Sequence, residues 1–308
     1  MDRSKQLFIR HPDNPILTGE HWPYLVNTVF NAAAADLDGE TLLLVRVEDR
    51  SGVSHLTVAR SADGIHDWRI EQQPALAPSP DHPEEQWGVE DPRATWLEEL
   101  GRFAVTYTAY SPPGPLVALA TTADFRTWER IGPVLPPENK DAALLPQRFD
   151  GRWAMLHRPV TSMESGAHIW LSFSPDLRHW GDHRPLLLAR TGPYWDAGKI
   201  GLSAQPLRTE RGWLLLYHGV KHTCFGSIYR QGLALLDLQD PRTVLGRTHE
   251  WVFSPFESYE RSGDVGNVVF ACGWMLAGDE VRLYYAGADT CMAVATAPLD
   301  QVLAAVAP

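Results

Sequence analysis

The chain of 308 residues carries 27 Lys and Arg against 38 Asp and Glu, which gives a formal net charge of −11. This acidic balance argues against a nucleic-acid partner, because phosphate backbones are held by clustered Lys and Arg. Hydrophobic residues make up 44% of the chain and charged residues 21%, as in a folded globular protein, while 24 Pro and 24 Gly favour short strands and turns over long helices.

Signals for secretion, membrane insertion and metal binding are weak throughout the sequence. The segment Met1–Lys5 is polar and leads into a polar region, unlike a secretory signal. No apolar run approaches the roughly 18 residues that a membrane helix requires. The cysteines Cys224, Cys272 and Cys291 are odd in number and widely spaced, which fits neither a disulfide framework nor a zinc site. We therefore expect a cytoplasmic protein that binds no metal and contacts no membrane.

A hairpin-like unit recurs five times along the chain. Each unit predicts an apolar strand, a turn containing glycine and a second apolar strand. The turn glycines recur at intervals of about 60 residues. They are Gly39, Gly101, Gly151, Gly212 and Gly278, and the strands that follow them are expected at 41–46, 103–108, 153–158, 213–218 and 281–286.

A third strand in each unit is expected to end at an acidic turn. The turn residues are Asp63, Asp124, Asp176, Asp237 and Asp300. Such a unit cannot bury its apolar face alone, whereas radial packing of several small sheets buries it. We predict an all-β, five-bladed β-propeller in which residues 1–308 form a single catalytic domain. A β-sandwich is the alternative, but its roughly seven to nine strands would not need a regular period.

Polar residues stand at similar offsets within the five units. Before the turn glycines these residues are Asn31, Asp91, Asp141, Lys199 and Asn267, and after the turns they are Arg46, Arg158 and His218. The innermost strands of a propeller all begin at one mouth of its channel, so we expect these side chains to share one pocket. A pocket of mixed charge suits a polyhydroxylated or anionic small ligand.

Five motifs resemble the β-mannoside phosphorylases of glycoside hydrolase family 130. They are Gly88–Arg93 (GVEDPR), Leu156–Pro159 (LHRP), Lys199–Gly201 (KIG), Gly212–Gly219 (GWLLLYHG) and Asp289. The resemblance covers nearly the whole chain and keeps the family's order. The family fold is a five-bladed propeller, in agreement with the repeat.

The resemblance implies an inverting glycoside phosphorylase, a glycosyl-transferring enzyme of carbohydrate metabolism. Inorganic phosphate would attack the anomeric carbon of a β-mannoside and release α-mannose 1-phosphate. The substrate would be a β-1,4- or β-1,2-linked manno-oligosaccharide or mannosyl-glucose, with phosphate as co-substrate and no cofactor. The linkage and the acceptor sugar stay open because loops around the mouth of the channel set them. The oligomeric state is equally open, and a homo-oligomer is possible.

The resemblance also assigns roles by position. Asp91 matches the family's proton donor, which acts through the 3-hydroxyl of the bound mannose. The residues implied for substrate binding are Asn31, Arg46, Arg93 and Asp289, and those implied for phosphate binding are Lys140, Arg158, Lys199, His218 and Tyr229. Cations in place of a second carboxylate suit phosphate, which is already nucleophilic and needs only to be held in line.

One departure from the family's pattern keeps alternatives open. Asp141 stands where the family commonly has Asn, and its carboxylate would repel phosphate unless Lys140 pairs with it. An inverting β-mannosidase that uses Asp141 as base for water is therefore the main alternative. Two others are a five-bladed furanoside glycosidase using Asp36, Asp91 and Glu164, and a non-catalytic sugar-binding propeller, which would not need Asp91.

Overall fold

A computed structural model describes residues 6–162, 166–224 and 226–306, and in these parts β-strands dominate. The strands fall into five groups. The first contains β2 (Thr28–Leu37), β3 (Glu40–Glu48), β4 (Ser54–Ser61) and β5 (Arg69–Ile70), and the second β6 (Gly88–Leu97), β7 (Arg102–Tyr110), β8 (Leu116–Thr122) and β9 (Glu129–Leu135). The third contains β10 (Asn139–Phe149), β11 (Arg152–Ser162), β12 (Gly166–Ala167), β13 (Ile169–Ser174) and β14 (Gly181–Leu187).

The fourth group contains β15 (Lys199–Leu202), β16 (Leu207–Thr209), β17 (Gly212–Thr223), β18 (Gly226–Leu236) and β19 (Val244–Arg247). The fifth contains β20 (Val269–Ala277), β21 (Glu280–Gly287), β22 (Cys291–Pro298) and the early strand β1 (Ile9–Arg10). In the described part of the chain, three short helices lie between groups: η2 (Gly19–His21), η3 (Pro83–Glu85) and α1 (Ser258–Arg261). Two others do not: η4 (Glu98–Leu100) lies between β6 and β7, and α2 (Leu299–Ala305) follows β22. Within the described ranges, no helix is long and apolar enough to cross a membrane.

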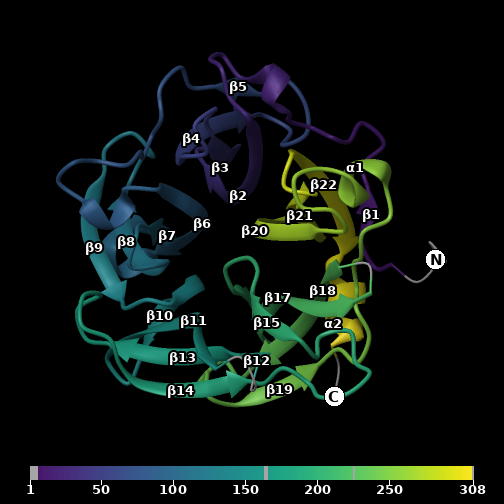
Figure 1. The fold of residues 1–308 in the computed structure, drawn as a ribbon. Coiled ribbons are helices and arrows are strands. Elements are labelled where there is room, and N and C mark those ends of the chain that lie inside the picture. Colours follow the sequence, from purple (N-terminus) through teal and green to yellow (C-terminus); the bar gives the residue numbers. More distant parts are fainter. Residues whose placement is uncertain (1–5, 163–165, 225, 307–308) are drawn as a thin grey trace.

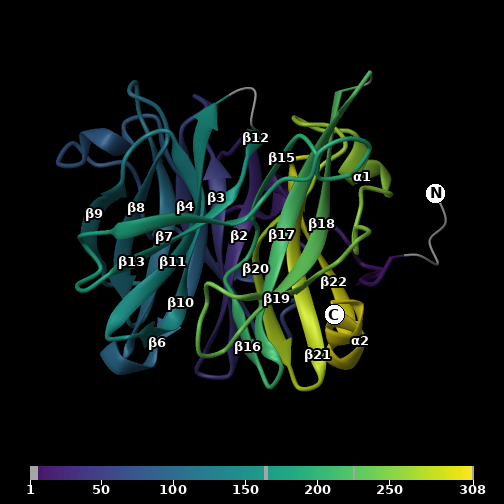
Figure 2. The ribbon, with the colours of Figure 1, turned by 90° about the horizontal axis from the view of Figure 1, so that it is seen from below.

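The five groups are arranged around a common centre, with β2, β6, β10, β15 and β20 innermost (Figure 1). Seen from the side, the strands run between the two faces of the molecule (Figure 2). Neighbouring strands within a group are antiparallel, and one parallel pair, Ser54 with Gly88, joins the first group to the second in a single sheet. Because β1 pairs with β22, both ends of the chain contribute to the fifth group.

The five predicted turn glycines and the strands expected after them are confirmed, whereas Asp300, expected in an acidic turn, lies in the first turn of α2. All five turn glycines have positive φ, between 59° and 149°. Four of them lie between an inner strand and the next strand of the group, and Gly212 is the first residue of β17. Glycine suits these positions because side chains disfavour that backbone region. The five strands expected after the turns lie within β3, β7, β11, β17 and β21.

Apolar clusters fill the space between each pair of neighbouring groups. Leu44 of the first group lies in one cluster with Val105 of the second, and Leu144 of the third lies in another with Leu119 of the second. Similar clusters join the third group to the fourth, the fourth to the fifth, and the fifth back to the first. Each sheet face is therefore buried against the next group rather than against a separate layer of helices.

Candidate active site

Three inner strands contain the same irregularity at a polar residue. Asn31, Asp91 and Asp141 have φ values of 48°, 48° and 54°, and the pairing register shifts at each of them. Asn and Asp tolerate positive φ better than other residues with a side chain. A bulge of this kind re-aims its side chain, and all three side chains line one central cavity.

This cavity brings together nine of the ten residues predicted to form the site. Its volume is about 200 Å³. The residues that line it are Asn31, Arg46, Asp91, Lys140, Asp141, Arg158, Lys199, His218, Tyr229, Val265, Val268, Phe270 and Asp289. Among the predicted residues, Arg93 is the one that does not line it.

Asp91 is the centre of a first set of contacts. Its Oδ1 accepts hydrogen bonds from Asn31 Nδ2 and Arg46 Nη1, both at 2.8 Å. Arg46 also pairs with Glu90 through Nη2 at 3.0 Å and donates from Nε to Ser54 Oγ at 2.9 Å. The guanidinium is thus held between two carboxylates, with a fixed orientation toward Asp91.

The charges around Asp91 decide its protonation. Burial acts to raise the pKa of Asp91, but the charges of Arg46, Lys140 and Arg93 outweigh it, and the pKa lies below its usual value. Burial and the negative charge of Asp91 raise the pKa of Asp289 to about 7, although Arg46 opposes the shift. In the free protein, Asp91 is therefore ionised at neutral pH, while Asp289 is about half protonated there and mostly protonated at lower pH.

Asp141 is the centre of a second set of contacts. Its Oδ2 accepts a hydrogen bond from Arg158 Nε at 2.6 Å and lies 3.5 Å from His218 Nε2. Its partner is therefore Arg158 from β11 rather than the adjacent Lys140. Burial acts to raise the pKa of Asp141, but Arg158 and the other nearby basic groups hold it far below its usual value.

His218 lies against this second set as a neutral imidazole. Burial lowers its pKa to about 3, and Asp141 offsets the shift only in part. The ring stacks on Tyr229, with centroids 5.9 Å apart, and Lys199 Nζ lies 5.4 Å from the centre of the Tyr229 ring. Gly201 makes this packing possible, because a Cβ there would collide with Asp141 and His218.

Arg93 lies beneath the cavity and connects the two sets. It is 1% exposed and donates hydrogen bonds to the carbonyl oxygens of Asp91, Ser203 and Leu202 at 2.8, 2.7 and 3.2 Å. Its Nη2 also lies 3.6 Å from Asp141 Oδ1. A guanidinium with these partners positions backbone and carboxylates and does not face the cavity.

Two further residues singled out in the sequence, Asn267 and Asp36, lie away from the cavity. Asn267 does not line the cavity: the register shift of β20 falls after Phe270, so the offset that included Asn267 was out of step, and its carbonyl instead accepts the Tyr229 N–H at 3.1 Å. Asp36 is exposed and caps the turn at Gly39. Glu164 lies outside the described residues, so the structure does not assemble the furanosidase carboxylates within its described part.

Some site residues carried no signal in the sequence. Val265, Val268 and Phe270 form an apolar wall of the cavity. Ser203 lies behind His218, with Oγ 3.4 Å from Nδ1, and its hydroxyl donates to Gln231 at 2.7 Å. These residues fall in ordinary strand and loop sequence. An alignment of the fourth and fifth units with the other three was the one sequence signal that could have identified them.

A cavity lined by carboxylates, cations and an amide on an all-β scaffold fits the class of carbohydrate-cleaving enzymes. Residues 10–307 match the family described as beta-1,4-mannooligosaccharide phosphorylase. The chain belongs to glycoside hydrolase family 130.

Similar proteins agree with this assignment. A beta-1,2-mannobiose phosphorylase of Listeria innocua is 34% identical, and the match covers 96% of this chain and 97% of that protein. The solved structure of a beta-1,2-mannobiose phosphorylase from Listeria innocua with beta-1,2-mannobiose has a TM-score of 0.89 at 32% identity, covering 97% of this chain and 99% of the other. A third structure, with a TM-score of 0.85 at 27% identity, covers 100% of this chain and 98% of the other. It was described in work on family members that hydrolyse beta-1,2 mannosidic linkages in Candida mannan.

Proposed function

We propose that the protein is an inverting β-mannoside phosphorylase that converts a β-mannoside and inorganic phosphate to α-mannose 1-phosphate. One observation carries the proposal: Arg158, Lys199 and Lys140 line the same small cavity as Asp91. Phosphate needs such cations to neutralise its charge and hold it in line with the leaving group. The similarity to mannoside phosphorylases over nearly the whole chain supports the same reaction.

The same proposal includes the fold of the chain and its location in the cell. Five strand groups with an apolar cluster between each neighbouring pair support a five-bladed β-propeller, formed by residues 1–308 as one catalytic domain. The three cysteines are free thiols, with Cys224 exposed. An exposed thiol suits a reducing compartment, which supports a cytoplasmic location.

In the proposed mannose subsite, Asn31, Arg46 and Asp289 contact the sugar and Asp91 supplies the proton. Asp91 must gain a proton to act as an acid, since it is ionised in the free protein. Arrival of phosphate adds negative charge to the cavity and raises the pKa of Asp91 toward the range of a general acid. The protonated Asp289 nearby can donate a hydrogen bond to a sugar hydroxyl.

In the proposed phosphate subsite, Arg158 makes the main contacts with phosphate. Its Nε is bound to Asp141, and we assign its terminal Nη1 and Nη2 to two phosphate oxygens. Lys140 and Lys199 add charge, and Tyr229 and His218 complete the subsite. Arg93 is a positioning residue, because its contacts are with backbone carbonyls under the cavity.

The hydrolase alternative depends on Asp141 as a base, and its surroundings argue against that role. A general base works best with a pKa near the working pH. Arg158 and its other basic neighbours hold the pKa of Asp141 far below this range. Asp141 is better suited to orienting Arg158 than to activating water.

Product analysis tests the proposal. The chain is incubated with β-1,2-mannobiose, β-1,4-mannobiose or mannosyl-glucose, each with and without phosphate. We expect α-mannose 1-phosphate only when phosphate is present, and the best of the three substrates identifies the linkage. Release of free mannose at the same rate in both conditions would show a hydrolase instead.

A further inference from the structure

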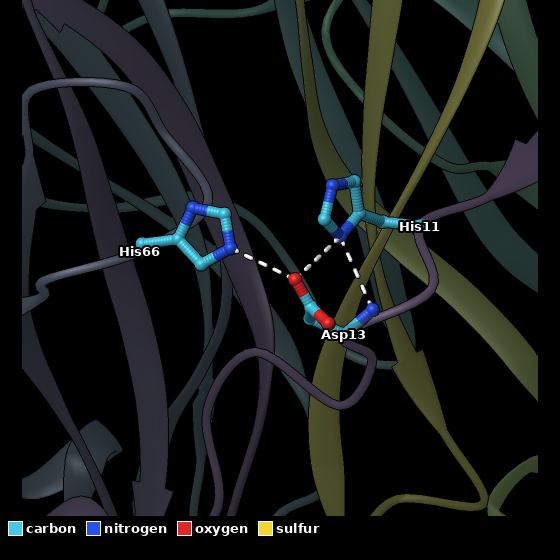
Figure 3. Close-up of side chains that lie close together, drawn as sticks. All are labelled: His11, Asp13 and His66. Atoms are coloured by element: carbon cyan, nitrogen blue, oxygen red, sulfur yellow. Dashed lines mark hydrogen bonds and ion pairs between the residues drawn. The ribbon is translucent and has the colours of Figure 1, made fainter.

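A second cluster of ligand-type side chains lies outside the cavity. His11 and Asp13 follow β1, and His66 lies in the turn after β4. The carboxylate of Asp13 is between the two imidazole rings (Figure 3). Asp13 Oδ2 lies 3.0 Å from His66 Nε2 and 3.8 Å from His11 Nδ1. All three ligand atoms lie within 4.8 Å of one another.

We propose that His11 Nδ1, Asp13 Oδ2 and His66 Nε2 form a binding site for a zinc ion. Imidazole nitrogens and a carboxylate oxygen are ligands that zinc prefers, at distances near 2.1 Å. Two such ligands at a tetrahedral angle lie about 3.4 Å apart, between the two Asp13 distances found here. Water would complete the coordination, because Asp13 and His66 are partly open to solvent.

The orientation of both histidines favours coordination. His66 Nδ1 lies 2.9 Å from Asp63 Oδ2, while backbone N–H groups of Ile65 and His66 hold Asp63 Oδ1, both at 2.8 Å. A carboxylate behind an imidazole fixes its tautomer and strengthens it as a ligand. His11 Nδ1 accepts the Asp13 N–H at 3.2 Å, so it carries a lone pair, and zinc would replace this long hydrogen bond.

The repeat provides an internal comparison for His66. Asp176 and His179 occupy the same turn of the third group, with His179 Nδ1 2.7 Å from Asp176 Oδ2. The His179 side chain is 83% exposed, against 48% for His66. His179 belongs to no group of three ligand atoms among the described residues. The turn alone therefore does not make the site, whereas the segment after β1 brings the other two ligands to His66.

The position of the site gives zinc a structural effect. His11 follows the outermost strand of the fifth group, and His66 belongs to the first group. One ion bound by both would link the start of the chain to the first group at the seam between the two groups. A ligand that binds only the folded state raises the unfolding temperature.

The test is zinc titration of the tag-free chain in phosphate-free buffer, followed by calorimetry and thermal unfolding. We expect one zinc per chain and a rise in Tm of about 4 °C at a hundredfold excess over Kd. His66→Ala should abolish both effects, while the matched control His179→Ala should keep both. Magnesium should produce neither effect, because it prefers oxygen ligands.

Asp63→Asn separates a zinc site from a simple ion pair between His66 and Asp13. Asn keeps the oxygen that caps the turn but loses the carboxylate behind His66, and we expect zinc affinity to fall about 10- to 100-fold. The proposal is overturned if the wild-type chain binds no zinc, or if His66→Ala still binds one zinc with the wild-type affinity. Circular dichroism of each variant without zinc shows that it is folded.

Discussion

Asp91 and Asp141 occupy the same position in two neighbouring units, yet their surroundings differ. Both follow the start of an inner strand, both adopt positive φ at a bulge, and both are almost fully buried. Glu90 precedes Asp91, whereas Lys140 precedes Asp141. The repeat therefore sets where a carboxylate stands, and the residues beside it set what that carboxylate can do.

The difference is visible in how each carboxylate is held. Asn31 and Arg46, both from the first group, bind one oxygen of Asp91. Asp141 is bound by Arg158 of its own group and has His218 and Arg93 close to its two oxygens. These surroundings fit the proposed role of Asp91 in proton transfer, whereas Asp141 is held as an ionised partner of Arg158.

Of the substitutions that test this difference, Asp91→Asn should have the largest effect on turnover. Asn keeps the size of the side chain and an oxygen that can accept from Asn31 and Arg46, but it cannot donate an acidic proton. We expect kcat for phosphorolysis to fall about 10²- to 10⁴-fold, while calorimetry still detects mannose binding. Turnover within tenfold of wild type would exclude Asp91 as the proton donor. Loss of turnover with binding retained would exclude a non-catalytic sugar-binding protein.

Asp141→Asn is the matched substitution in the neighbouring unit and should have a much smaller effect. Removing this negative charge leaves Arg158 and the two lysines to attract phosphate more strongly. We expect the KM for phosphate to fall a few-fold, with kcat retained within about tenfold. If Asp141 were the base of a hydrolase, this variant would instead lose turnover as severely as Asp91→Asn.

The sequence predicted most of the strands and the positions of several site residues, because the repeat consists of short local motifs. A turn glycine followed by an apolar strand recurs in every unit, so the sequence predicted the strands and the matching positions of Asp91 and Asp141 along the inner strands. Of the nine predicted site residues that line the cavity, six stood at matching offsets in the repeat, and the resemblance added Lys140, Tyr229 and Asp289. Their individual roles came from the resemblance to a family.

What the sequence could not predict depends on contacts between units. Arg93 carries the same charge as Arg46, but it turns beneath the cavity because backbone carbonyls of Leu202 and Ser203 lie there. The partner of Asp141 is Arg158 on the paired strand, not its neighbour in sequence. His11 and His66 are 55 positions apart by number, and only closure of the first group against the fifth brings them together.

A third carboxylate of the cavity, Asp289, should make the free energy of unfolding depend on pH in a way that tests the charge of Asp91. Its pKa in the folded protein is about 7, against an ordinary value of 3.8, so between these pH values the folded chain holds a proton that the unfolded chain has lost. This group therefore makes the free energy of unfolding fall as pH rises from about 4 to 7, and adds no further change above that range. Asp289→Asn removes this contribution, so wild-type stability should decline relative to the variant over that interval in denaturant titrations.

The same experiment can be repeated with Asp91→Asn, because the charge of Asp91 is the largest cause of the Asp289 shift after burial. Without that charge, the pKa of Asp289 should fall, and the decline in stability that Asp289 contributes should end at lower pH. Parallel stability curves for the wild type and Asp289→Asn would show that Asp289 is ionised in the folded protein. An unchanged end point in the Asp91→Asn background would show that the two carboxylates do not interact. A shift to lower pH would instead tie the proton held by Asp289 to the ionised state of Asp91, the carboxylate that we propose as the proton donor.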